Sequence, residues 1–238
     1  MAVLCAISAY CCPGLAHADL KTGIVAYNKG DYATAKKEFS AAADAKDPTG
    51  MHLLGSLYYQ GHGVEKDIKR AVELFAAAAE LGWRPSQTNL GLIYQSGDGV
   101  KRDIRKAIEY YMAAGKQGDL QATYQLGQIF RKGDGVDQDY ARALDYYRLA
   151  VQQGYLPAVH EYGIMFANGD GVKADFVEAY GWIAYVAATG DENAKKNLAK
   201  IENALGDDLE KAKVRADEIS AEITRIRKEL ASSERPEQ

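Results

Sequence analysis

The sequence predicts an all-α protein built as an array of paired helices, and three observations lead to this prediction. First, the 238-residue chain repeats itself at a spacing of 36 residues. Second, apolar residues inside each repeat recur at steps of three and four, as on one face of a helix. Third, glycines return at the same places in each repeat, where reversals between helices need them. A period of this length is typical of helical solenoids, in which each repeat packs only on its neighbours.

The repeated positions divide each repeat into a first helix, a turn and a second helix. The first helix contains a glycine at Gly55, Gly91, Gly127 and Gly163. Because a glycine inside a helix costs about 1 kcal/mol relative to alanine, we expect this glycine to mark a close crossing of two helices. The turn reads Gly-x-Gly-Val, and in the third repeat Asp139 follows it and is expected to cap the second helix. A closing glycine, Gly154 in that repeat, ends the second helix.

The repeat also predicts the organisation of the chain. A first, degenerate repeat with a shortened leading helix is expected, because terminal repeats have one face without a neighbour. We place a signal peptide at 1–18, the degenerate repeat at 19–46, full repeats at 47–82, 83–118, 119–154 and 155–190 (together 47–190), a partial fifth repeat helix at 191–206, an amphipathic C-terminal helix at 207–231 and a disordered tail at 232–238.

The first 18 residues have the features of an export signal. They contain no Lys, Arg, Asp or Glu, and they end in a small-x-small sequence at Ala18, which is typical of a cleavable signal peptide. Cys5, Cys11 and Cys12 are the only cysteines, so cleavage would leave a mature chain without any, as fits a periplasmic protein stabilised by packing. A lipoprotein signal and a buried N-terminal strand are the alternatives. No other apolar run approaches the roughly 18 residues of a membrane span.

Composition and charge argue against several classes of function. The net charge is −4 and charges of both signs alternate finely, whereas a nucleic-acid binder needs a basic stripe. After residue 18 the only histidines are His52, His62 and His160, and no thiol remains. Asp98 and Asp103 offer too few oxygen ligands for a calcium loop in the second turn. We therefore expect no enzyme, cofactor or metal site, since no convergent set of titratable groups is present.

The combination of Leu-Gly-x-x-Tyr/Phe, Gly-x-Gly-Val, Asp-x-x-x-Ala and a closing glycine resembles the Sel1-like repeat, a relative of the tetratricopeptide repeat (TPR). In the second full repeat these residues are Leu90, Gly91, Tyr94, Gly97, Gly99, Val100, Asp103, Ala107 and Gly118. The resemblance covers nearly all of 19–206. It implies a right-handed α-solenoid of helix-turn-helix, TPR-like repeats with a concave groove. Exported bacterial proteins of this type serve as adaptors, as host-directed binders or as immunity proteins.

Comparison between repeats separates residues that hold the fold from residues that are free to bind. Positions of the first helix that differ between repeats are expected to line the concave face and to contact a partner. These are His52, Ser56, Tyr59, Asn89, Leu92, Gln95, Tyr124, Gln128, Arg131, His160, Ile164 and Asn168. We expect Tyr59, Leu92, Tyr124 and Ile164 to be exposed anchors, because exposed aromatic and aliphatic residues often dominate protein interfaces.

The sequence thus predicts a non-enzymatic periplasmic adaptor that binds another protein through its concave face. Two alternatives stay open. One is an immunity protein that neutralises a secreted toxin. The other is a peptidoglycan- or glycan-binding envelope protein, in which the groove tyrosines would stack on sugars.

The C-terminal helix departs from the repeat and shows a heptad pattern. Its apolar residues are Leu209, Ala212, Ala216, Ile219, Ile223, Ile226 and Leu230, at alternating steps of three and four. We expect this helix to cap the open end of the solenoid. The alternative is a coiled-coil handle, with a homodimer formed through Ile219, Ile223, Ile226 and Leu230.

Overall fold

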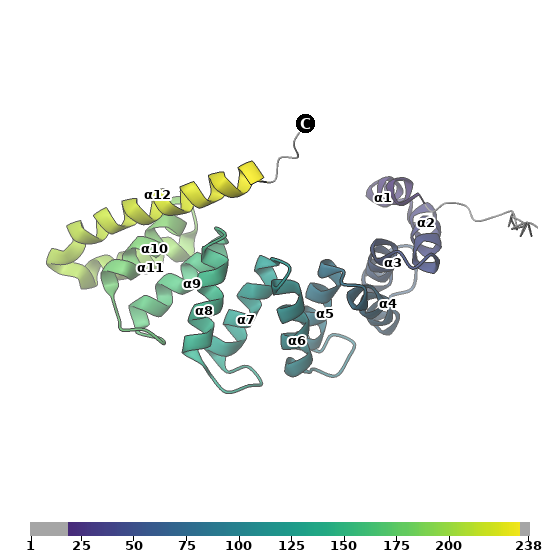
Figure 1. Cartoon of the computed structure of the whole chain (residues 1–238), viewed down its shortest axis with the longest axis horizontal. Coiled ribbons are helices and arrows are strands. Elements are labelled where there is room, and N and C mark those ends of the chain that lie inside the picture. Colours follow the sequence, from purple (N-terminus) through teal and green to yellow (C-terminus); the bar gives the residue numbers. More distant parts are fainter. Residues whose placement is uncertain (1–18, 234–238) are drawn as a thin grey trace, which may run out of the picture. The chain divides into compact units, whose positions relative to one another are not determined.

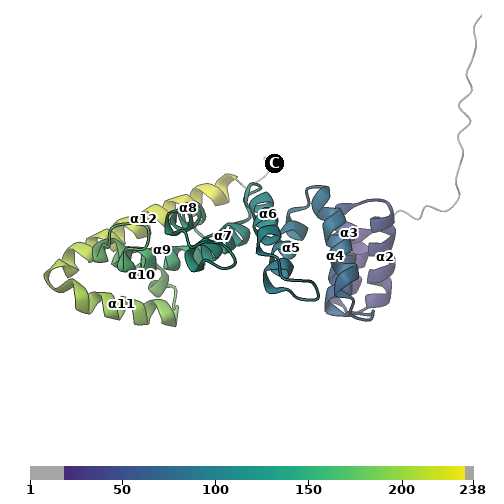
Figure 2. The same ribbon diagram turned by 90° about the horizontal axis from the view of Figure 1, so that it is seen from below.

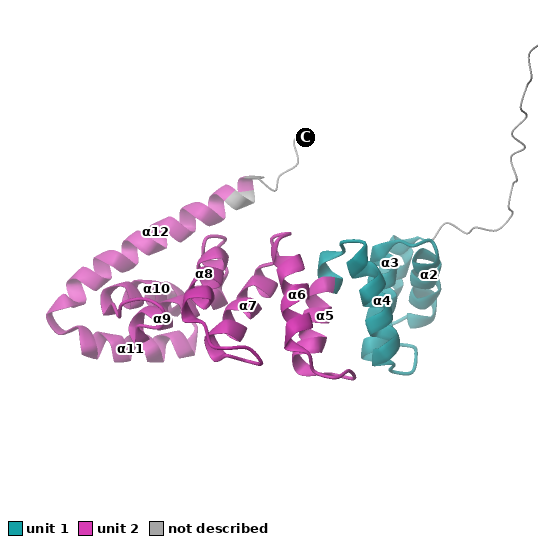
Figure 3. Ribbon diagram, turned by 60° about the horizontal axis from the view of Figure 1, so that its bottom comes forward, with its two compact units in different colours: residues 1–86 teal, residues 87–238 magenta. Residues whose placement is uncertain are grey.

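The computed structural model describes residues 19–233, and every regular element in that range is a helix (Figure 1). The chain divides into two compact units, unit 1 at 1–86 and unit 2 at 87–238, which Figure 3 shows in different colours. The predicted all-α fold of repeated helix pairs is confirmed. The expected signal peptide and residues 234–238 of the expected tail lie outside the described residues. None of the helices in the described range combines the length and apolarity that a membrane crossing requires.

Unit 1 consists of consecutive helices that each pack on the next. They are α1 (Leu20–Asn28), α2 (Tyr32–Asp44), α3 (Pro48–Gln60) and α4 (Ile68–Glu80). The next helix, α5 (Arg84–Ser96), begins in unit 1 and continues into unit 2. Phe39, Leu54 and Leu57 belong to the buried core of unit 1. The helices α1 and α2 lie in the range 19–46, where a degenerate first repeat is predicted.

Unit 2 continues the pattern around a single buried core. Its helices are α6 (Ile104–Gly115), α7 (Leu120–Lys132), α8 (Tyr140–Val151), α9 (Leu156–Asn168), α10 (Phe176–Ala188), α11 (Glu192–Leu205) and α12 (Leu209–Ser233), with a 3₁₀ turn at Gly206–Asp208. From α6 to α11 each helix contacts the next (Figure 2). The first helices of successive repeats are therefore α5, α7, α9 and α11.

The repeated glycine of the first helix lies at a close helix crossing, as expected. A Cβ atom added to Gly127 on α7 would lie 2.5 Å from Cε1 of Tyr147 on α8. In the preceding repeat, the same construction on Gly91 gives 2.4 Å to Cε1 of Tyr111. Both tyrosine rings are fully buried, so any side chain at the glycine would have to displace a packed ring. This explains why the helix keeps a residue that its own propensity disfavours.

The turn between paired helices is also built as the sequence predicts. Gly133 and Gly135 have φ angles of +67° and +70°, a left-handed conformation that glycine adopts without steric cost. Asp139 is the N-cap of α8, and its carboxylate accepts a hydrogen bond of 2.9 Å from the backbone N–H of Arg142. The second helices of the other full repeats begin at equivalent caps, Asp67, Asp103 and Asp175.

The C-terminal helix α12 packs along α10 and so covers the end of unit 2 (Figure 1). Ile219 and Ile223 are fully buried within this chain. Ile219 occupies the space that Gly181 leaves open, with its Cδ1 atom 2.6 Å from the place of an added Cβ. This corrects the alternative of a dimer seam at Ile219 and Ile223, because both side chains already pack in their own chain. Ile226 is half-buried, and the side chain of Leu230 lies outside the described part.

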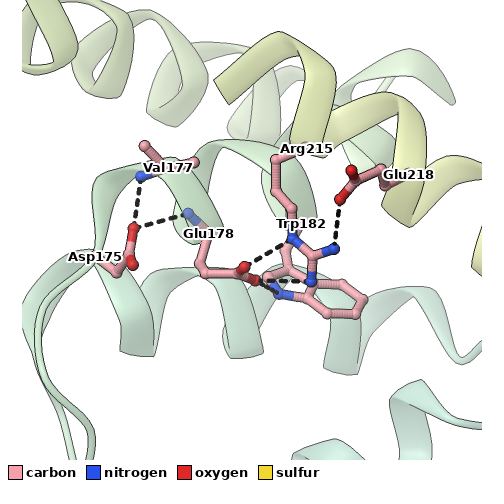
Figure 4. A network of polar contacts seen from close by, with 6 residues as sticks. All are labelled: Asp175, Val177, Glu178, Trp182, Arg215 and Glu218. Atoms are coloured by element: carbon pink, nitrogen blue, oxygen red, sulfur yellow. Dashed lines mark hydrogen bonds and ion pairs between the residues drawn. The ribbon is translucent and has the colours of Figure 1, made fainter. Parts of the chain in front are cut away.

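A polar network holds α12 against α10 (Figure 4). The Arg215 guanidinium on α12 donates to both carboxylate oxygens of Glu178, at 2.7 and 3.3 Å. The same carboxylate accepts from Nε1 of Trp182 at 3.2 Å. Glu178, Glu218 and their hydrogen bonds raise the pKa of Arg215, although burial works in the opposite direction. A two-pronged contact of this kind fixes both position and orientation of the helix.

Candidate functional site

The first helices of unit 2 carry a groove made of three adjoining depressions. The largest has a volume of about 660 Å³, and the other two have volumes of about 360 and 330 Å³. Glu161 lines all three, while Tyr124, Arg131 and His160 each line two. Because the depressions share these residues, we treat them as one surface and call it the unit 2 groove. Residues from the predicted set that line it are Gln95, Tyr124, Gln128, Arg131, His160, Ile164 and Asn168.

An ion pair between α7 and α9 lies where the depressions meet. Nη2 of Arg131 is 3.4 Å from Oε2 of Glu161, and the two side chains are only 24% and 20% exposed. Burial by itself lowers the pKa of Arg131, but the charge of Glu161, together with Tyr147 and Asp170, raises that pKa above its ordinary value. Arg131 is therefore a permanent positive charge in a partly desolvated setting, where electrostatic contacts are stronger than in water.

Tyr124 is held in place by contacts with Gln128, Tyr147 and Tyr155. Its hydroxyl oxygen accepts a 2.8 Å hydrogen bond from Nε2 of Gln128. Its ring packs at tilted angles against Tyr147 and Tyr155, with centroids 5.8 and 5.7 Å away. Burial, and then the charge of Glu161, raise the pKa of the Tyr124 hydroxyl. Tyr124 therefore contributes a neutral, fixed hydroxyl to the groove.

Next to the ion pair lie buried polar atoms of Gln128, Arg131 and Tyr147. Among the described residues, Oε1 of Gln128 is a buried side-chain atom without a hydrogen-bond partner in the protein, whereas Arg131 and the Tyr147 hydroxyl interact with each other. The side chain of Gln128 is 8% exposed and that of Tyr147 is fully buried. Buried polar groups in proteins are nearly always paired. The amide oxygen of Gln128 therefore holds hydrogen-bonding capacity that the fold itself does not use.

The largest depression combines an apolar floor with a polar rim. Ile164 on α9, Phe176 at the start of α10 and Ile201 on α11 supply apolar surface. On the rim, Nδ2 of Asn197 lies 3.2 Å from Nε2 of His160. Phe176 is 42% exposed, so part of its ring is available to a partner. The depression can therefore accept an apolar group and form hydrogen bonds with polar groups next to it.

The predicted residues of α3 belong to unit 1 and make contacts within it. Nδ1 of His52 lies 2.9 Å from Oγ of Ser86, and burial lowers the pKa of His52. Ser56 donates its hydroxyl to the backbone carbonyl of His52 at 2.9 Å. The ammonium of Lys66 lies 5.6 Å from the ring centroid of Tyr59.

Several predicted anchors are less exposed than expected. Tyr59, Leu92, Tyr124 and Ile164 are half-buried, as is Asn89, and Gln128 is buried. The prediction of fully exposed anchors is therefore wrong. Side chains of the first helices pack against neighbouring residues, as Leu92 packs against the core of unit 2. Variation of a position between repeats therefore does not imply that its side chain is exposed.

Other groove residues were absent from the predicted set. Asn197 and Lys200 line the groove from α11, and they follow Glu161 and Ile164 by one period of 36 residues. Extending the comparison between repeats into the partial fifth repeat would have identified both. Phe176 gave a weaker signal, because its position in the other repeats also carries a large apolar residue.

Among the described residues, no three or more His, Cys, Asp or Glu side chains are grouped as metal ligands would be. The fold and groove define a helical repeat protein whose crossing glycines and capping aspartates recur in every full repeat. The Sel1 repeat family matches residues 48–83, 84–119, 120–155 and 156–184, which is more than half of the chain. The chain therefore belongs to the Sel1 repeat family.

Individual relatives are similar to the chain over different lengths. The Sel1 repeat protein from Oxalobacter formigenes has a structure that matches with a TM-score of 0.71 and 32% identity, over 76% of this chain and 75% of that one. The protective antigen c5321 of uropathogenic Escherichia coli matches with a TM-score of 0.52 and 22% identity, over 92% of this chain and 56% of that one. At this identity the match shows only that the two proteins share a fold. HcpC of Helicobacter pylori, which carries a beta-lactamase name, is 47% identical over 73 residues. That match covers 29% of this chain, which spans only 25% of HcpC.

Proposed function

We propose that this protein is a non-enzymatic periplasmic scaffold that binds a partner protein through the unit 2 groove. The observation that carries the proposal is the half-buried Arg131–Glu161 ion pair where the three depressions meet, with the buried and unpartnered Oε1 atom of Gln128 in the same groove. A buried amide oxygen without a partner destabilises the free protein, since it forgoes the hydrogen bonds that water would provide. A partner that supplies the missing bonds recovers this energy on binding.

The composition of the groove supports a protein as the partner. Arginine and tyrosine are enriched among the residues that dominate binding energy in protein interfaces, particularly where they are partly desolvated. A glycan partner would need an aromatic face free for stacking. The ring of Tyr124 packs against Tyr147 and Tyr155, which disfavours stacking of a sugar on this groove tyrosine and leaves Phe176 as the more exposed aromatic side chain of the groove.

We also propose that the role is not enzymatic. The match to HcpC covers a quarter of that protein, so its beta-lactamase name gives no reason to assign an activity here. The groove offers a permanently charged arginine and tyrosines with raised pKa values. Neither type of group is tuned to exchange protons near neutral pH, which general acid–base catalysis requires. The histidine of the groove, His160, has its Nε2 atom 3.2 Å from the amide of Asn197.

The proposed location rests on the predicted signal peptide and on the residue that follows it. Asp19 would be the first residue of the mature chain. It is the N-cap of α1, and its backbone N–H donates to Oε2 of Glu38 at 3.1 Å. Mass spectrometry of the intact protein from a periplasmic extract is expected to give a chain that starts at Asp19. A chain that keeps residues 1–18 would contradict both the cleavage and the location.

Site-specific photo-crosslinking in intact cells tests the binding face. A photoreactive residue replaces Lys132, which is exposed and lines the groove. The matched control carries it at Leu149 on α8, which is 49% exposed and lines none of the three depressions. We expect a discrete protein adduct from position 132 alone, and its loss when Arg131→Glu is added. Adducts of equal yield at both positions, or none at 132, would contradict the proposal. If the captured protein is a toxin, the alternative of an immunity protein is supported.

A further inference from the structure

A further depression of unit 2 lies at the turn between α5 and α6 and carries a surplus of positive charge. It has a volume of about 620 Å³, and its lining includes Tyr94, Lys101, Arg102, Asp103, Arg105 and Lys106. We call it the basic depression. Its one acidic residue is the N-cap of α6, where the Asp103 carboxylate accepts from the backbone N–H of Lys106 at 3.1 Å. Four basic side chains therefore face a single carboxylate that is already bound.

Two of the four basic side chains serve the repeat itself. Nε of Arg102 donates to the backbone carbonyl of Gln95 at 2.9 Å, and the residues one period later form the same side-chain-to-carbonyl contact. The ammonium of Lys106 lies 5.1 Å from the ring centroid of Tyr94, and one period later a guanidinium lies over a phenylalanine ring. Because the next repeat reproduces both contacts, the fold explains the presence of Arg102 and Lys106.

Lys101 and Arg105 have no such role in the fold. Both side chains are exposed, and among the described residues neither forms an ion pair, a side-chain hydrogen bond or a contact with an aromatic ring. One period later their places are taken by Asp137 and Ala141, so the repeat requires no positive charge at either position. The charges of Lys101 and Arg105 are therefore available to a ligand.

The basic depression borders the unit 2 groove through Arg102. Besides its bond to the Gln95 carbonyl, Arg102 forms an ion pair with Asp134 in the next turn. Gln95 and Asp134 both line the groove depression of about 360 Å³. A partner that occupies this part of the groove and extends past Arg102 therefore meets the basic depression.

The charge distribution of the chain favours a short acidic segment as the ligand. Guanidinium and ammonium groups bind carboxylates and phosphates. Nucleic acids and anionic membranes, however, bind to broad basic surfaces. The surplus here is local, because the whole chain has a net charge of −4. A segment with two or three Asp or Glu residues needs only this depression, and its position beside the groove indicates that the segment belongs to the partner protein.

We propose that the basic depression is a second docking point for the partner protein and binds an acidic segment of it. Carboxylates of the segment pair with Lys101 and Arg105, while Arg102 stays bound to its neighbours in the repeat. Charges at the edge of an interface mainly steer association and select among partners. This inference rests on the proposed function and adds the charge of the partner beside the part that occupies the groove.

The probe for this site is a hexaglutamate peptide, titrated into the ¹⁵N-labelled full chain and followed by NMR. We expect the amide signals of 101–106 to shift. Binding should weaken about tenfold in Lys101→Glu/Arg105→Glu, because two attractions become repulsions. The control, Lys173→Glu/Lys196→Glu, makes the same change in net charge at two exposed lysines that line neither the basic depression nor the groove. It should bind the peptide as the unchanged protein does.

Tripolyphosphate and phosphatidylglycerol vesicles, titrated in parallel, test the other sources of negative charge. Three results would overturn the inference. They are unchanged amide signals at 101–106, equal binding of hexaglutamate by the two double variants, and tighter binding of tripolyphosphate or vesicles than of hexaglutamate. The last result would assign a phosphate ligand to the depression instead.

The photo-crosslink at Lys132 reports the proposed function separately. We expect the yield of its partner adduct to fall in Lys101→Glu/Arg105→Glu and to stay unchanged in the control variant. An undiminished yield would leave the scaffold proposal standing and refute the acidic segment. If no variant gives an adduct, the scaffold proposal falls, whereas binding of hexaglutamate at 101–106 would still identify an acidic ligand for the depression.

Discussion

Replacement of Ile219 by alanine tests whether α12 is an integral part of unit 2. Ile219 is fully buried and fills the space above Gly181 on α10. Removing the outer atoms of a fully buried isoleucine costs about 2–5 kcal/mol, from lost burial and from the cavity left behind. The free energy of unfolding of a domain is typically about 5–15 kcal/mol. We therefore expect Ile219→Ala to lower the stability of unit 2 by a large fraction of its total.

Val214 provides the matched control on the same helix. Its side chain is 60% exposed, so Val214→Ala is expected to change the free energy of unfolding by no more than about 0.5 kcal/mol. Urea denaturation followed by circular dichroism gives both values, and light scattering gives the mass of each variant. The capping role is refuted if the two variants are equally stable. It is also refuted if the loss for Ile219→Ala depends on protein concentration, because α12 would then be packing against a second copy.

Three further substitutions test the helix crossing, a buried histidine and a cap. Gly127→Ala gains about 1 kcal/mol in helix propensity but overlaps the Tyr147 ring, and overpacking costs about 1–3 kcal/mol, so its denaturation midpoint should not rise and is expected to fall. Burial lowers the pKa of His52 in the folded protein below its ordinary 6.5. As the pH falls below about 6.5, the unfolded chain therefore takes up a proton at His52 more readily than the folded protein does, and the free energy of unfolding should drop. Denaturation at pH 7.5 and 5.5 should show this difference for the unchanged protein and not for a His52→Gln variant. Asp139→Ala should cost about 0.5–2 kcal/mol through loss of the N-cap of α8, whereas Asp139→Asn should cost less because the amide oxygen still accepts the bond.

The parts of the fold that packing imposes on every repeat could be predicted from the sequence. Gly127 and Asp139 recur at their positions because each repeat must solve the same steric and capping problem. A glycine that is costly in a helix, yet present in every full repeat, has to be explained by a close contact. The structure supplies that contact in the ring of Tyr147.

The role of α12 could not be decided from its pattern. Ile219 and Ile223 follow a heptad spacing, and the same spacing suits a partner helix in another chain or a neighbouring helix in the same one. The deciding feature is Gly181 on α10, which leaves room for Ile219. Gly181 lies outside the repeated glycine positions, and its use becomes visible only when the two helices are placed together.

The burial of the candidate site residues was the property that the sequence predicted least well. Gln128 varies between repeats and is polar, and both facts favour a surface position. It is nevertheless buried, because its amide lies against Tyr124 within its own helix. Sequence comparison therefore identified residues that line the groove but overestimated how far their side chains reach into solvent.

The cap and the groove are linked through the helices between them. Glu178 on α10 bonds Arg215 of α12 and the indole of Trp182. The Trp182 ring packs edge-on against Tyr162 of α9, at a centroid distance of 5.3 Å, and the residue before Tyr162 is Glu161, which pairs with Arg131. The contacts that begin at α12 thus reach α9 at Tyr162, the residue next to Glu161 of the groove ion pair. Because binding sites depend on such supporting contacts for their geometry, loss of α12 should weaken the groove even though the residues that line it come from other helices.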